Sequence, residues 1–146
     1  MKRLFDESVD KYWILMSINE AKSSVLQNMA DSYEELFNTV KNKLTKYKEQ
    51  LFWGKYEGDK VLFFYVCIRS KKWFKLDLSC PHGKWLLYLK LWKNKNFSKE
   101  DVPKKIRNAV ESRGFSIKIE KKGVLLREYE NPSSAVEDVK EILDRL

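Results

Sequence analysis

The chain has few of the residues that build metal centres and nucleophilic catalysts: one histidine and two cysteines among 146 residues. A structural zinc site needs four such ligands and a catalytic zinc site at least three. Cys80 and His82 are close in the sequence, but no further ligands accompany them. No serine near His82 fits a pair in which histidine activates a hydroxyl group. We therefore expect no metal site, no cofactor and no nucleophile–base pair.

Glycine, proline and long apolar runs are also scarce. The five glycines are isolated, whereas a phosphate cradle needs several around one turn. The longest apolar run, Val61–Ile68, has eight residues, and a membrane span needs about 20. The first residues lack the apolar core of a signal peptide. These absences predict a cytoplasmic protein without membrane contact.

A metal-dependent nuclease of the restriction type is a further candidate for a basic domain. Such a site needs an acid on one strand and an acid-x-lysine triplet on the next. Asp77 could supply the first acid, but the next strand has Tyr88 where the carboxylate before Lys90 is required. Glu128 has no such triplet, and Glu120 stands at a turn. The sequence thus predicts a protein that is not an enzyme.

The length and the apolar content favour one folded domain over residues 1–146, with residues 1–30 as an N-terminal helical segment packed on it. Apolar residues at helical spacing continue to Leu51. They predict two helices with a break near Asp31-Ser32, where Ser32 and Glu35 form a capping box.

Strict alternation of apolar and polar residues then predicts three antiparallel strands, over residues 61–69, 73–79 and 85–92. A hairpin of the first two strands places Cys67 opposite Lys75 and Cys80 opposite Leu62. The two sulfurs would then be about 16 Å apart along the strands, too far for a disulfide. We expect two reduced thiols.

The remainder predicts a helix from Ser98 or Asp101 to Gly114, a hairpin of Phe115–Glu120 with Val124–Glu130, and a last helix after Asn131-Pro132. The expected order is α-α-β-β-β-α-β-β-α. It describes an α+β domain with a mostly antiparallel sheet of about five strands and helices packed on that sheet.

The net charge of +8 is unevenly distributed along the chain. Residues 1–37 carry a net charge of −3, residues 38–96 a net charge of +10, and residues 97–146 a net charge of +1. The middle segment also holds four of the five tryptophans. The excess positive charge and most of the tryptophans therefore lie in the same segment of the chain.

Nucleic-acid-binding sheets stack bases on rings and surround them with cations that displace phosphate counterions. The second face and the ends of the three strands supply such residues. We predict a non-catalytic module that binds DNA or RNA through Lys55, Arg69, Lys71, Lys72, Trp73, Lys75, Tyr88, Lys90, Trp92, Lys93 and Lys95.

Three alternatives stay open. The aromatic residues can belong to a sheet face that is simply covered, with the lysines as solubilising charge. The chain can be a protein–protein interaction subunit of a defence or nuclease complex, or a homo-oligomer, held by charge complementarity. It can also enclose a small-molecule pocket lined by Trp13, Trp53, Phe63 and Tyr65.

The Lys-Lys turn and Leu-x-Leu strand of Ser70–Leu78, together with the closing segment Ala135–Leu143, resemble a family. It is a small uncharacterised α+β domain family found alone or C-terminal to restriction-endonuclease-like domains. The resemblance spans residues 33–146. Lys121-Lys122-Gly123-Val124 stands where the family has Gly-Asn-Gly-Asp. The resemblance implies an α+β fold and no known activity.

Overall fold

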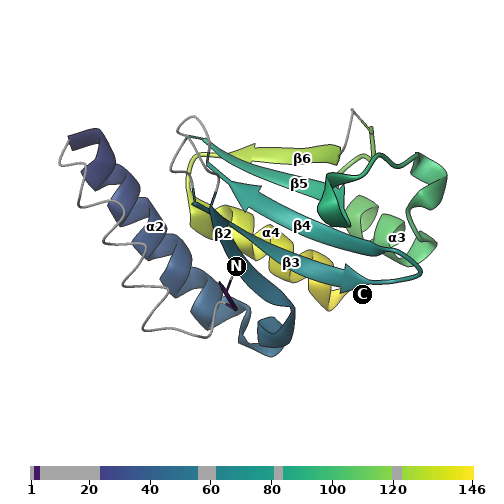
Figure 1. Cartoon of the computed structure of the whole chain (residues 1–146), viewed down its shortest axis with the longest axis horizontal. Coiled ribbons are helices and arrows are strands. Elements are labelled where there is room, and N and C mark those ends of the chain that lie inside the picture. Colours follow the sequence, from purple (N-terminus) through teal and green to yellow (C-terminus); the bar gives the residue numbers. More distant parts are fainter. Residues whose placement is uncertain (1, 4–23, 56–61, 81–83, 120–122) are drawn as a thin grey trace.

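The computed structural model describes residues 2–3, 24–55, 62–80, 84–119 and 123–146 (Figure 1). Its strands are β1 (Lys2–Arg3), β2 (Leu51–Lys55), β3 (Leu62–Arg69), β4 (Trp73–Ser79), β5 (Trp85–Leu91) and β6 (Gly123–Tyr129). Its α-helices are α2 (Ser24–Lys43), α3 (Lys104–Ser112) and α4 (Pro132–Asp144). Three short 3-10 helices lie between these elements: η1 (Thr45–Gln50), η2 (Trp92–Asn94) and η3 (Lys99–Asp101). All six strands form one sheet in sequence order, with every neighbouring pair antiparallel.

The helices and the antiparallel sheet confirm the predicted α+β class. One face of the sheet carries the apolar residues that the alternation assigned to it, such as Val66, Leu76 and Leu89, all essentially buried. Figure 1 shows α3 and α4 on the same side of the sheet. Ile106 of α3 and Val139 of α4 belong to the same core cluster as these strand residues. The core therefore lies between this face of the sheet and the helices.

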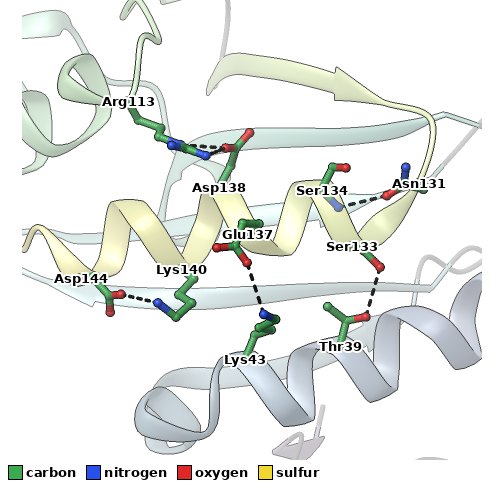
Figure 2. A network of polar contacts seen from close by, with 10 residues as sticks. All are labelled: Thr39, Lys43, Arg113, Asn131, Ser133, Ser134, Glu137, Asp138, Lys140 and Asp144. Atoms are coloured by element: carbon green, nitrogen blue, oxygen red, sulfur yellow. Dashed lines mark hydrogen bonds and ion pairs between the residues drawn. The ribbon is translucent and has the colours of Figure 1, made fainter.

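Helix α2 packs beside α4 and joins it through polar contacts at its surface (Figure 2). Thr39 Oγ1 lies 3.3 Å from Ser133 Oγ, and Lys43 Nζ lies 3.8 Å from a Glu137 carboxylate oxygen. Asn131 caps α4 by accepting a hydrogen bond from the Ser134 amide at 3.0 Å. This cap confirms the predicted start of the last helix.

The buried carboxylate of Asp138 connects α4 to its other neighbours. Arg113 donates to it from Nε at 2.9 Å, and Arg127 lies 3.4 Å from its second oxygen. Tyr129 donates its hydroxyl to that same oxygen at 2.5 Å. The Asp138 side chain thus joins α4 to strand β6 and to the residue that follows α3.

The N-terminal prediction was wrong in two places. Helix α2 continues through residues 31 and 32, because an aspartate or a serine inside a helix costs only about 0.5 kcal/mol relative to alanine, less than the packing of Leu36 and Val40 stabilises. The helix ends at Lys43, and Leu51 begins β2, a strand that the helical spacing had concealed. The helix predicted over residues 9–23 lies outside the described residues.

The predicted register of the β3–β4 hairpin is confirmed: Cys67 pairs with Lys75, and no disulfide joins the two cysteines. Residues 115–119, however, form no strand in the described structure. Phe115 and Ile117 are buried while Ser116 and Lys118 are exposed, which imitates a strand pattern without strand pairing. No helix among the described residues is both long and apolar enough to cross a bilayer.

Candidate nucleic-acid interface

The second face of the sheet, opposite the helices, contains a small aromatic cluster. Tyr65 and Cys67 of β3 are buried there, with Phe52 and Trp92 packed against them. The Phe52 and Tyr65 rings are stacked with centroids 5.5 Å apart, and Trp92 meets Tyr65 edge-on at 5.6 Å. Burial raises the pKa of the Cys67 thiol to about 11. This part of the face is therefore packed.

Next to that cluster, Asp77 lies between two lysines. Its Oδ2 atom is 3.8 Å from Lys75 Nζ and 3.7 Å from Lys90 Nζ. Lys75 is 7 % exposed and Asp77 is 1 % exposed. Burial lowers the pKa of Lys75 and raises the pKa of Asp77, because water no longer solvates either charge. Lys75 is thus an internal residue in this structure.

The rings proposed as a stacking platform differ in exposure. Tyr88 and Trp92 are half-buried, and Lys90 Nζ lies 4.8 Å from the centre of the Tyr88 ring. Lys75 Nζ lies 6.0 Å from the centre of the Trp92 ring. Trp73, by contrast, is 47 % exposed, one of two large apolar side chains so exposed in the described chain. Of these three rings, Trp73 is the one that faces solvent most fully.

Six of the predicted residues meet at one end of the sheet, which we call the basic end: Arg69, Lys71, Lys72, Trp73, Lys93 and Lys95. The β3–β4 turn brings the first four together, since Arg69 pairs directly with Trp73 across it. Phe74 pairs with Leu91, so η2 and the residues after it begin beside the same turn. All six side chains are exposed.

The basic end carries little compensating negative charge. Lys72 Nζ lies 3.0 Å from Asp101, whose carboxylate also closes a capping box with Ser98. No ion pair joins Lys71, Lys93 or Lys95 to a carboxylate of the described residues. The Arg69 guanidinium carbon lies 5.7 Å from the centre of the Trp73 ring. The result is an exposed indole ring among cations, of which Lys72 alone has a carboxylate partner within the described part of the chain.

Lys55 does not belong to this end. It pairs with Leu62 at the start of β3, whereas Arg69 is the last residue of that strand. Seven residues separate the two positions along β3, which corresponds to about 23 Å at about 3.3 Å per residue. The structure therefore does not bring Lys55 together with the other predicted residues.

An open groove of about 990 Å³ lies beside the last residues of β3 and next to the basic end. Its walls include three aromatic side chains of the second face and the sheet end, Phe52, Trp73 and Trp92. The charged residues among those that line it are Glu49, Arg69 and Lys105. The groove thus combines ring surfaces with two cationic side chains and one acidic side chain.

The pocket predicted between helix and sheet stays a prediction, because three of its four side chains are not described. Trp13 lies outside the described residues, and the side chains of Trp53 and Phe63 are not described. Tyr65 is packed between Phe52 and Trp92. The groove beside β3 is a different place, and Tyr65 is not among its lining residues.

The described part of the chain holds no group of three or more histidine, cysteine, aspartate or glutamate side chains that could bind a metal ion. Asp77 faces lysines rather than a second acid, and Glu128 lies 3.9 Å from Lys84. His82 and Glu120 lie outside the described residues. The basic end offers exposed cations and an exposed indole ring.

Sequence reasoning missed two residues near this surface. Asp101 pairs with Lys72 although 29 positions separate them, and nothing in the local sequence signals that contact. Lys105 reaches the groove from the first turn of α3. It falls outside the segment 38–96 on which the charge distribution focused attention, although the Lys104-Lys105 pair beside Pro103 was a visible signal.

Comparisons of the chain with protein-family models, with curated proteins and with solved structures found no match.

Proposed function

We propose that the protein binds nucleic acid, DNA or RNA, through the basic end of its sheet and without strong sequence preference. The observation that carries the proposal is Trp73, exposed at the β3–β4 turn with the Arg69 guanidinium over its ring. An exposed ring beside cations is the combination that single-strand binding surfaces use. We further propose a cytoplasmic location, supported by two cysteines that no disulfide joins.

The cations of the basic end have the chemistry to contact phosphates. Lys71, Lys93 and Lys95 are exposed and belong to two segments that meet at the sheet end. Each lysine that neutralises a phosphate releases condensed counterions, which favours binding at low salt. Lys72, by contrast, already has an ion pair with Asp101.

The proposal leaves Lys75 out of the contact surface. Its ammonium group lies 5.1 Å from the centre of the Tyr65 ring and 3.8 Å from Asp77 Oδ2. Reaching a phosphate would break both contacts and expose the buried carboxylate, at a cost of several kcal/mol. Lys75 instead supports the aromatic cluster from within.

Fluorescence anisotropy with a labelled mixed-sequence single-stranded oligonucleotide tests the proposal. We expect the logarithm of the association constant to fall linearly with the logarithm of the salt concentration. Each phosphate contact should add about 0.7 to the magnitude of the slope. Lys71→Ala and Lys93→Ala should each weaken binding and reduce the slope by about 0.7.

Lys84→Ala is the matched control. Lys84 is also exposed, but it lies just before β5, at the opposite end from η2, and its ion pair with Glu128 is 3.9 Å long. We expect this variant to bind like the unchanged protein. Absence of binding at low salt, or equal losses in all three variants, would contradict the proposal.

A further inference from the structure

We infer that the groove beside β3 accepts unpaired bases, so that the ligand of the basic end is a single strand rather than a duplex. This inference rests on the proposed function and specifies the class of nucleic acid. It concerns a place that the charge pattern did not identify, because the groove is lined mainly by apolar and aromatic side chains.

The groove lies where a strand bound to the lysines would place its bases. Arg69 and Trp73 are residues of the basic end and also line the groove. Phosphates held by Lys71 and Lys93 outside would therefore leave the attached bases within reach of the groove. Its volume of about 990 Å³ is at the upper end of the roughly 300–1,000 Å³ that small-ligand sites occupy.

The inner wall of the groove is fixed in position by the aromatic cluster on the second face of the sheet. Phe52 stacks on Tyr65, and Trp92 meets the same ring edge-on. Lys75 lies over both Tyr65 and Trp92, and Asp77 holds Lys75 in turn. A wall that is already ordered loses little conformational entropy on binding, which favours the stacking of a flat ligand.

A duplex cannot use these walls. Its bases are stacked on one another and paired, so their faces are hidden, whereas a single strand can turn its bases onto protein rings. The lysines alone would accept either ligand, because phosphate contacts carry no information about base pairing. The aromatic groove is therefore the feature that distinguishes the two.

The test compares three ligands of equal phosphate number: a mixed-sequence single strand, a blunt duplex of half its length, and an abasic single strand of its full length. We expect the intact single strand to bind most tightly and to quench tryptophan fluorescence. Trp73→Ala should weaken its binding between about fivefold and 150-fold, the range expected for one stacked base. The same variant should leave the abasic strand unaffected.

Two further variants separate stacking from charge and from misfolding. Trp73→Phe retains a ring and should keep most of the preference for the intact strand, with reduced quenching. Lys71→Ala should weaken binding of the intact and the abasic strands alike. Equal affinity for all three ligands would overturn the inference and leave the proposed function standing, whereas binding to none of them at low salt would overturn both.

Discussion

Trp73 and Lys75 stand two positions apart on β4 and on the same face of the sheet, yet their exposure differs sharply. Trp73 lies at the first position of the strand and is 47 % exposed, whereas Lys75 lies two positions further in and is 7 % exposed. Alternation in the sequence predicts which face a residue occupies. It does not predict whether that face is covered, because the cover comes from segments distant in the chain.

Asp138 is the residue whose removal should be most visible in stability. Asp138→Ala would leave the buried Tyr129 hydroxyl without its acceptor and would separate Arg113 and Arg127 from their shared carboxylate. We expect unfolding in urea to show a loss of about 1–3 kcal/mol.

The neighbouring substitution Glu137→Ala is the matched comparison. Glu137 precedes Asp138 on α4 but makes an exposed ion pair with Lys43 at 3.8 Å. Exposed pairs of this kind contribute at most about 1 kcal/mol. Similar losses in the two variants would show that the Asp138 network does not tie the elements together.

At the scale of elements, the sequence predicted the three central strands, the final helix and the β3–β4 register well. Each has a strong local signal, such as the alternation of β3 and the Asn131 cap of α4. Predictions failed where one pattern fitted two structures. Leu51 continued a helical spacing and also begins β2, and Phe115 and Ile117 alternate in burial without strand pairing.

The candidate site is an assembly of such elements, so only part of it could be predicted. The Lys71-Lys72-Trp73 turn was visible as a local pattern. The tertiary fold brings this turn close to η2, to Asp101 of η3 and to Lys105 of α3. The groove between these segments has no counterpart in any single stretch of sequence.

The contact between the β3–β4 turn and η3 supports a prediction about binding. Asp101→Asn should keep an acceptor for the Ser98 amide, since the asparagine side-chain oxygen can take that hydrogen bond, while it removes the negative charge that holds Lys72. We expect tighter binding of single-stranded nucleic acid at low salt and a salt slope larger by about 0.7. The free energy of unfolding should change by less than about 1 kcal/mol.

Anisotropy titrations across salt, paired with urea unfolding, check this expectation. Unchanged affinity in a folded Asp101→Asn variant would mean that the basic end does not contact phosphates near Lys72.

At the scale of the whole molecule, the titrating groups predict sensitivity to alkali. Burial is the main cause that raises the pKa of Tyr47 to about 12 and that of Cys67 to about 11, and it also raises the pKa values of Tyr65 and Tyr129. A group whose pKa is higher in the folded protein than in the unfolded chain stabilises the folded state. This stabilisation is fully present below the pKa of the unfolded chain and is lost as the pH rises through the pKa of the folded protein.

We therefore expect the urea midpoint to fall as the pH rises from about 9, where an unfolded thiol ionises, towards 12. Lys75 acts in the opposite direction because burial lowers its pKa, but it is one group against four whose pKa values are raised. Tyr47→Phe should make the fall less steep. A midpoint that stays constant between pH 8 and pH 11 would contradict this account.

The excess positive charge lies in residues 38–96, the fold brings five cations of that segment together at the basic end, and we propose that this end binds the nucleic acid. The most direct test of that claim is to titrate the ¹⁵N-labelled protein with a mixed-sequence single strand and to follow each amide and indole signal. The account predicts that the largest shifts fall on Arg69–Trp73, on Lys93 and Lys95, and on the Trp73 indole. Shifts confined to the surfaces of α2 and α4, or no shifts at low salt, would contradict it.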